Sequence, residues 1–513
     1  MVYDFKEITP SPQLAWQPCF GEFTCTYLTV PLDYDHPDVG TTDVAYIKYT
    51  SANGTGQDIL FNPGGPGSSG VVSLINFKDE FVKLFGNDYN FISFDPRGVN
   101  NSGPALSCGK TGPGKSSAPL PEKWALAKAN GEFCAAFNRN TSASYAGTSA
   151  VVQDMVHLTE LEAEACGKNP EEAKLWYYGI SYGTVIGQTL AAMYPNRLGR
   201  LLLDGNVYGV EHYQGFVPSA VEETDVAFGF FFDYCYEAGP ELCPLAENAT
   251  SAFSIQNRYQ AFLRKVELEP ITVKGDTSII TRNDIELVAF QAMYSPNKGF
   301  YALARQIVAM EQGDTSEVPA LLSILGIGSA FETAFPSDPD GQENTGGAEL
   351  QLITCVDTAG RYALKSFSDY RAASEQLAQK STYGGSTLAS ANVLFCNGLD
   401  IAPPASQLFP GFQETNTSVP ILFVGTTGDP VTPVYSAHKM SEIFPGSVVL
   451  TQKAPGHSFL ALESKCSNAY AAAYMKDGSL PDVGAVCGID VTAADVFTAG
   501  AKVFENTLAK SAT

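Results

Sequence analysis

The chain has 513 residues, of which 31 are basic and 55 acidic, and its formal net charge is −24. This length permits a large buried core and more than one structural unit, while the negative balance argues against nucleic acid or an anionic membrane as a partner. The apolar runs stay shorter than the roughly 18 residues that a membrane-spanning helix needs, so none is predicted.

The first 206 residues alternate between strand and helix patterns. This alternation predicts a mostly parallel sheet with helices on both faces. The predicted strands lie at 26–31, 43–49, 58–62, 91–95, 175–180 and 200–204, and the predicted helices at 149–166 and 184–194.

The alternation stops at residue 207. Up to residue 414 the sequence is helical, polar and broken by Pro and Gly, and strands resume at 421–425 and 447–451 before helices near 459–475 and 493–509. We therefore predict a sheet core made of residues 1–206 and 415–513. Residues 207–414 are expected to form a mainly helical cap that lies over the site and selects what enters it.

A glycine-rich loop, Asn62-Pro-Gly-Gly-Pro-Gly67, follows the predicted strand 58–62. Without side chains, Gly64 and Gly65 can turn their backbone N–H groups toward a negatively charged oxygen. We predict that one of them forms an oxyanion hole with the N–H of Tyr182. An ordinary Gly/Pro turn is the alternative.

The pentapeptide Gly179-Ile-Ser-Tyr-Gly183 stands between a short apolar strand and a helix that ends at Pro195. In this context G-x-S-x-G predicts a nucleophile elbow, a tight turn that pushes the serine hydroxyl out of the sheet. Ser181 is the predicted nucleophile. A chance match in a chain rich in Gly and Ser is the alternative.

After such a serine, the remaining triad members follow in the order acid, then histidine. Asp429 leaves the predicted strand 421–425, and His457 follows the predicted strand 447–451, so both are placed at carboxyl ends of strands. We predict that Asp429 orients His457, which acts as the base. A helix-capping Asp429 and an ordinary loop histidine are the alternatives, and Asp357 and Asp400 are fallback acids.

The chain has eleven cysteines and no CxxC metal pattern. This number favours five disulfides and an oxidising, extracellular location, although a reduced intracellular protein stays an alternative. Of Cys108, Cys134 and Cys166 one must stay unpaired. The candidates for pairing are Cys19 with Cys25, Cys108 with Cys134, Cys235 with Cys243, Cys355 with Cys396, and Cys466 with Cys487.

Two further features bear on location. Asparagines 53, 100, 140, 248 and 416 begin glycosylation sequons. The N-terminal residues Met1-Val-Tyr-Asp4 do not resemble a signal peptide, so we expect a mature secreted chain with an added Met.

Several motifs together resemble the proline-iminopeptidase and tripeptidyl-aminopeptidase enzymes among the α/β-hydrolases. The resemblance runs from about residue 16 to 490, and its ending with Cys466 and Cys487 is similar to the tripeptidyl branch. The motifs are Asn62–Gly70, Phe94-Asp-Pro-Arg-Gly98, Tyr178–Thr184, Leu203-Asp-Gly205, Gly428-Asp-Pro-Val-Thr-Pro433 and Gly456-His457.

The resemblance implies an α/β-hydrolase fold, with an eight-stranded sheet and a helical cap inserted after strand 6. It also implies Ser181, Asp429 and His457 as the triad, and exopeptidase activity at free N-termini without metal or cofactor. Three places depart from the family pattern, and we expect them to line the pocket: Asn100, the segment Asn206-Val-Tyr-Gly209 and the segment Asn397-Gly-Leu399.

An aminopeptidase must also hold an α-ammonium group, which carboxylates in the cap would favour. Glu222, Glu223 and Asp225 form an acidic cluster early in the insertion and are the candidates; a solvated helix face is the alternative. The sequence thus predicts a serine hydrolase acting on peptides. A carboxylesterase or acyltransferase acting on small esters or amides, and an inactive binding protein, are the alternatives.

Overall fold

The computed structural model describes residues 1–513 except 52–55, 109–117, 274–278, 326–346, 391 and 512–513. Its largest feature is one twisted sheet, whose strands run in the order β1-β2-β3-β5-β4-β6-β7-β10-β11-β12. These strands are β1 (Gln17–Cys19), β2 (Phe23–Pro31), β3 (Thr41–Tyr49), β4 (Gln57–Asn62), β5 (Tyr89–Phe94), β6 (Leu175–Ile180), β7 (Leu198–Asp204), β10 (Leu422–Gly428), β11 (Val448–Pro455) and β12 (Val486–Cys487).

From β5 to β12 the neighbouring strands pair in parallel, whereas β1, β2, β3 and β5 pair antiparallel. The central strands are apolar on both faces; β7, for example, carries three consecutive buried leucines, Leu201 to Leu203. Such strands require cover on both faces. The predicted α/β-hydrolase fold class is therefore confirmed.

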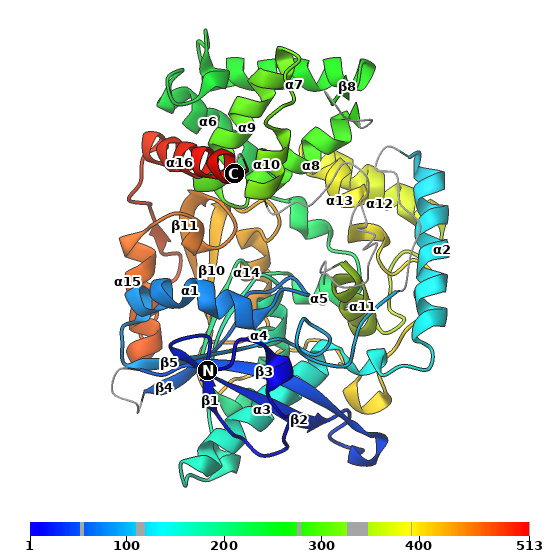
Figure 1. Ribbon diagram of the computed structural model, residues 1–513, viewed down its shortest axis with the longest axis vertical. Helices are drawn as coiled ribbons and strands as arrows, with labels where there is room; N and C mark the ends of the chain where they lie inside the picture. Colours follow the sequence, from blue (N-terminus) through cyan, green and yellow to red (C-terminus); the bar gives the residue numbers. More distant parts are fainter. Residues whose placement is uncertain (52–55, 109–117, 274–278, 326–346, 391, 512–513) are drawn as a thin grey trace.

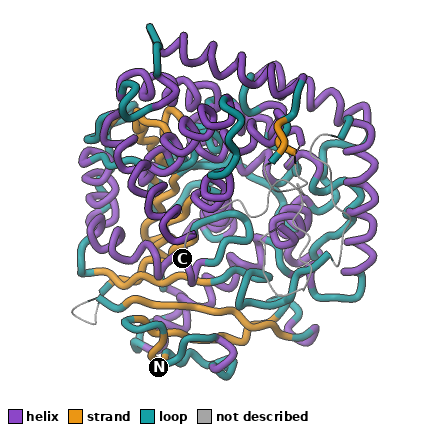
Figure 2. The backbone as a smooth tube through the Cα atoms, turned by 45° about the horizontal axis from the view of Figure 1, so that its top comes forward, coloured by secondary structure: helices purple, strands orange, loops and turns teal. Residues whose placement is uncertain are grey.

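Helices supply that cover. On one face α1 (Gly70–Phe85) and α15 (Lys465–Asp477) pack through side chains such as Phe81 and Tyr474. On the other face lie α3 (Thr148–Ala165), α4 (Tyr182–Met193) and α14 (Val434–Ser441). Figure 2 shows the strands as a continuous band with helices on both sides.

The sheet has ten strands among the described residues, not the eight that we expected. The additional edge strands β1 and β12 have three and two residues. Segments this short carry no readable alternation of apolar and polar residues. The Cys19–Cys25 disulfide joins β1 to β2, and the Cys466–Cys487 disulfide ties β12 to α15, so covalent bonds hold both edges.

Between β7 and β10 the chain forms a large helical region and a short hairpin, β8 (Ile271–Thr272) with β9 (Ile279–Ile280). Because β7 and β10 are neighbours in the sheet, the chain leaves and re-enters the sheet at one place. The helices are α5 (Gly209–His212), α6 (Thr224–Ala238), α7 (Ala252–Leu268), α8 (Arg282–Ala292), α9 (Pro296–Glu311), α10 (Val318–Ile324), α11 (Gly347–Thr358), α12 (Phe367–Lys380) and α13 (Gly385–Ser390).

Two helices from outside residues 207–414 join this region (Figure 1). The last helix, α16 (Ala493–Ser511), packs against α9 and α6 and buries Phe497 and Phe504 in the same apolar cluster as Phe231. Helix α2 (Leu120–Asn138) packs on α12, where the Trp124 ring stacks on that of Tyr370. The sequence pattern did not anticipate either contact.

All five candidate cysteine pairs are disulfide-bonded in the structure, and Cys166 is free and exposed. The sequon residue Asn53 lies outside the described residues. The other four sequon asparagines, at 100, 140, 248 and 416, are exposed. Among the described residues, no helix combines the length and apolarity that crossing a bilayer demands.

Candidate functional site

Ser181 occupies the turn between β6 and α4. Its φ is +59°, a left-handed conformation that is uncommon for a residue with a side chain. A Cβ on Gly179 would stand 2.4 Å from the carbonyl oxygen of Gly183, and one on Gly183 would stand 2.5 Å from that of Asn62. The two glycines therefore allow the turn to close, and the strain points to a functional serine.

Asp429 and His457 meet at the carboxyl ends of β10 and β11. The Asp429 side chain is fully buried, and its Oδ2 lies 2.9 Å from Nδ1 of His457. Asp429 Oδ1 also accepts hydrogen bonds from the backbone N–H groups of Val431 at 3.0 Å and Thr432 at 2.9 Å, and Oδ2 accepts one from the Thr432 hydroxyl at 2.8 Å. These donors fix the carboxylate so that it accepts the Nδ1 proton, which leaves Nε2 unprotonated in the neutral ring.

The proton affinity of His457 depends on this carboxylate. Burial opposes protonation of the ring, but the charge and hydrogen bond of Asp429 outweigh it, so the pKa of His457 is raised above 6.5. The helical region also holds this residue: the His457 backbone N–H donates to the carbonyl of Tyr294 at 3.0 Å, and the Tyr294 ring lies edge-on to the imidazole.

A second buried carboxylate supports the loop that carries His457. Asp204, at the end of β7, accepts hydrogen bonds from the Ser458 hydroxyl, from the Phe459 N–H at 3.0 Å and from the Tyr178 hydroxyl at 3.1 Å. Burial raises the pKa of Asp204 to about 6 in spite of these donors. Because Ser458 adopts a positive φ of +77°, the loop needs such anchors to hold His457 in place.

The glycine-rich loop after β4 approaches the elbow closely. A Cβ on Gly64, whose φ is +103°, would stand 2.6 Å from the carbonyl oxygen of Ile180 and 2.9 Å from the nitrogen of Tyr182. The Gly64 N–H donates to Oδ1 of Asn62 at 2.9 Å and is therefore already used. Of the two predicted glycine donors, Gly65 is the one that lines the cavity beside Ser181 and Tyr182.

Ser181 and His457 open into one cavity of about 450 Å³. Core loops, the segment around α5, and helices α8, α11, α12 and α13 enclose it. Most of its lining is apolar, with polar groups close to Ser181. The apolar lining includes Phe216, Val217, Leu350, Leu377, Leu388 and Phe395.

The cavity wall also contains a pair that the sequence did not reveal. His212 at the end of α5 lines the cavity, and its Nε2 lies 2.9 Å from Oδ2 of Asp357 in α11. We had considered Asp357 only as a fallback for Asp429. Since 145 residues separate the two side chains, no local pattern marks them as partners. Asp400, the other fallback acid, is exposed.

The acidic cluster does not reach the cavity, which corrects our expectation for an ammonium site. Glu222 pairs with Lys380, and Asp225 accepts hydrogen bonds from the Ser381 hydroxyl and two backbone N–H groups that follow it. Glu223 accepts a hydrogen bond from the Val434 N–H at 2.9 Å. All three carboxylates are thus used to join elements of the fold.

Most of the departures from the family pattern are also structural, although we expected them to line the cavity. Asn206 donates to the carbonyls of Leu203 and Val424 and so connects β7 to β10. Asn397 donates to the Trp124 carbonyl at 2.9 Å. Of the departing positions, Val207 alone is among the described residues that line the cavity.

Glu223 gives a first prediction, for stability. Burial and the nearby charge of Asp429 raise its pKa from 4.5 to about 7, so between these pH values the folded state binds more protons than the unfolded state. Stability should therefore fall as pH rises through this window. In Glu223→Gln the free energy of unfolding should decrease by about 1–2 kcal/mol less over this pH range than in the unchanged protein, allowing for the partial exposure of the side chain. Urea unfolding at about pH 5 and about pH 8 measures the difference.

Glu442→Gln is the matched control for this prediction, because Glu442 is exposed and pairs only weakly with Lys439. Its pH dependence should equal that of the unchanged protein. If Glu223→Gln lowers the free energy of unfolding equally at both pH values, the carboxyl group stabilises the protein through its contacts, and its protonation does not cause the pH dependence.

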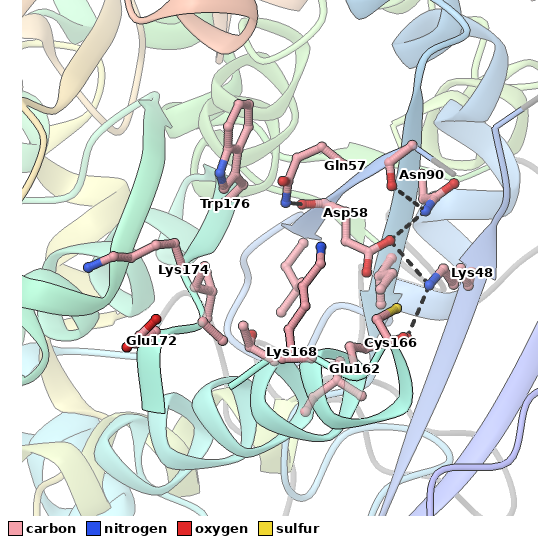
Figure 3. A pocket seen from close by; sticks show the side chains of 18 of the residues that line it. Lys48, Gln57, Asp58, Asn90, Glu162, Cys166, Lys168, Glu172, Lys174 and Trp176 are labelled. Atoms are coloured by element: carbon pink, nitrogen blue, oxygen red, sulfur yellow. Dashed lines mark hydrogen bonds and ion pairs between the residues drawn. The ribbon is translucent and has the colours of Figure 1, made fainter. Parts of the chain in front are cut away.

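A larger cavity of about 920 Å³ lies elsewhere, at the amino ends of β4 and β6 (Figure 3). Three of its charged groups pair with one another: Lys48 lies 3.1 Å from both Asp58 and Glu162. The triad candidates follow the carboxyl ends of the strands, at the opposite edge of the sheet. Ligands of open α/β sheets bind at that edge, so the smaller cavity is the candidate functional site.

Several known proteins are similar to this chain in sequence. Residues 59–232 match the family model described as "alpha/beta hydrolase fold", and residues 381–487 match that described as "TAP-like protein". The serine protease Hip1 of Mycobacterium tuberculosis is 25% identical over 496 residues, which are 92% of this chain and 90% of that protein.

Two further relatives differ in their stated activities. Carboxylesterase B of Mycobacterium tuberculosis is 24% identical over 504 residues, which cover 93% of this chain and 90% of its own. Tripeptidyl aminopeptidase of Streptomyces coelicolor is 28% identical over 215 residues, which cover 37% of this chain and 38% of its own. The similarity therefore extends over enzymes that act on peptides and on esters.

Proposed function

We propose that this chain is a secreted serine exopeptidase that releases amino acids or short peptides from free N-termini, because its residues 59–232 match the α/β-hydrolase family model and its residues 381–487 match the TAP-like model. One observation carries the proposal: a strained serine and a histidine held by a buried carboxylate open into the same cavity. The serine protease and aminopeptidase relatives support peptides as substrates.

In the proposed reaction, Ser181 attacks the substrate carbonyl while Nε2 of His457 takes the hydroxyl proton. The imidazolium that forms is stabilised by Asp429 and then protonates the leaving amine. The backbone N–H groups of Gly65 and Tyr182 hold the negative oxygen of the tetrahedral intermediate. Water, activated by the same histidine, hydrolyses the acyl-enzyme.

We also propose that residues 207–414 act as a cap, with residues 1–206 and 415–513 as the core. The single exit and re-entry point between β7 and β10 supports this division, and α8, α11, α12 and α13 supply cavity walls. Five disulfides and four exposed sequons support an extracellular location.

A carboxylesterase is the second candidate, favoured by the apolar cavity lining and by the carboxylesterase relative. The test compares free and N-acetylated amino-acyl, prolyl and tripeptidyl anilides with p-nitrophenyl acetate and butyrate. Turnover of free-amine anilides but not of acetylated ones is the expected result. Turnover of the esters alone would reject the exopeptidase and support the esterase.

Gly64→Ala should disturb the proposed oxyanion hole and the nucleophile turn together. The added Cβ would stand 2.6 Å from the Ile180 carbonyl oxygen, 2.8 Å from the Cβ of Ser181 and 2.9 Å from the Tyr182 nitrogen, and alanine is strained at a φ of +103°. Displacing one donor alone lowers kcat by about 10²–10³-fold, so at least that loss is expected. Gly229→Ala is the control, because nothing lies within 4 Å of its Cβ position. Full activity of Gly64→Ala would place the oxyanion donors elsewhere.

A further inference from the structure

A second imidazole lines the catalytic cavity, and the proposed reaction leaves it without a role. The His212 ring packs between those of Tyr182 and Tyr213, with centroid distances of 5.6 and 5.4 Å. Tyr182 directly follows the nucleophile, so His212 stands close to where a substrate bound at Ser181 must lie. Only 6% of His212 is exposed, which makes it part of the wall.

The partners of Asp357 decide which nitrogen of His212 carries the proton. Asp357 accepts hydrogen bonds from the Thr148 N–H at 2.7 Å and the Thr148 hydroxyl at 2.6 Å. That hydroxyl in turn lies 2.5 Å from the hydroxyl of Tyr182. Since an ionised carboxylate only accepts, Nε2 of His212 must donate to it. In the neutral ring, Nδ1 is then a hydrogen-bond acceptor, and no described residue hydrogen-bonds to it.

The charged group that contacts His212 is the Asp357 carboxylate. Asp357 is 4% exposed, and its donors are an amide, a hydroxyl and an imidazole, none of which needs to carry a charge. Arg361, the cation nearby in sequence, donates to the backbone carbonyls of Thr358, Asp357 and Phe409. Among the described residues that line the cavity there is no Asp, Glu, Lys or Arg.

We propose that His212, backed by Asp357, binds the protonated amino terminus of the substrate through Nδ1. An acceptor with a buried negative charge behind it fits an ammonium group and disfavours a carboxylate or a carbonyl oxygen. It also supplies, in an otherwise uncharged cavity, the recognition that Glu222, Glu223 and Asp225 cannot supply from their positions. The proposal rests on the exopeptidase function proposed above.

The test is His212→Phe, which keeps an aromatic ring between the two tyrosines and removes both nitrogens. A hydrogen bond to a charged group contributes enough that kcat/KM for a free-amine anilide should fall about 10–100-fold, mostly through KM. The kcat/KM for p-nitrophenyl butyrate should change less than about threefold, because the ester needs only the triad. The ratio of kcat/KM for the free anilide to kcat/KM for the N-acetylated anilide should fall by the same factor.

Asp357→Asn serves as the second variant, since it keeps the shape and removes the charge; it should reduce the same preference. His36→Phe replaces an exposed histidine and is the matched control; it should leave both kcat/KM values unchanged. A parallel loss with anilide and ester would assign His212 to packing and overturn the proposal. An unchanged preference in His212→Phe would also overturn it, and the exopeptidase function would survive. If the unchanged protein cleaves only esters, both proposals fail together.

Discussion

Ser181→Ala is expected to lower kcat by about 10⁴–10⁶-fold on every substrate that the enzyme turns over, with little change in stability, because alanine keeps the Cβ and the same backbone strain. The Ser181 hydroxyl makes no capping hydrogen bond to α4, and the positive φ of this residue is set by the turn between β6 and α4. The residual rate of the variant would measure what substrate binding and the oxyanion donors contribute.

Turnover of the best anilide and of p-nitrophenyl butyrate measures this effect, and labelling by a fluorophosphonate reports the nucleophile directly. Ser479→Ala changes an exposed serine and should keep both activity and labelling. If Ser181→Ala still reacts with the probe at the same rate, another residue is the nucleophile and the elbow is a structural turn.

Asp429→Asn is expected to cost about 10⁴-fold in kcat, with the protein still folded. The amide would present an N–H group to Nδ1 of His457, which would force the proton onto Nε2. That nitrogen could then no longer accept the Ser181 proton. Asp400→Asn, at an exposed position, is the control and should retain full activity.

The pH profile gives the same variant a second readout. The proposed base His457 can take a proton only when it is neutral, and its pKa is raised above 6.5, so kcat/KM should rise with pH as the pH passes through that raised pKa. Because Asp429 causes the increase, the midpoint of the residual activity in Asp429→Asn should move to lower pH. An unchanged midpoint would mean that a different group controls the profile.

The sequence predicted the features that depend on neighbouring residues. The turn at Ser181 is encoded within five residues, because Gly179 and Gly183 must both lack side chains for the turn to close. Strands such as β6 and β7 are continuous apolar runs whose bounds the pattern locates within a few residues. Asp429 and His457 could be proposed because each follows such a strand, and parallel strands end at one edge of a sheet.

Features that depend on contacts between distant residues could not be predicted from the sequence. The pairing of His212 with Asp357 brings together α5 and α11, and nothing near either residue signals it. The acidic cluster was misinterpreted for a related reason: its charge density is visible in the sequence, but its partners, Lys380, Ser381 and the N–H of Val434, are more than 150 residues away. The residue pattern of one segment predicts which of its faces is buried, but it does not predict which distant segment packs against that face.

The placement of α16 bears on when the enzyme becomes active during its production. Residues 493–511 leave the ribosome after every other described element, yet Phe497 and Phe504 belong to the apolar cluster formed by α6, α7, α8 and α9. Domains fold during synthesis from the amino terminus onward, so the sheet around Ser181 can form while the helical region still lacks part of its interior. That region supplies the Tyr294 carbonyl that holds His457. Active-site assembly is thereby coupled to the docking of α16, and a chain in which α16 is undocked should carry a folded sheet without an assembled triad.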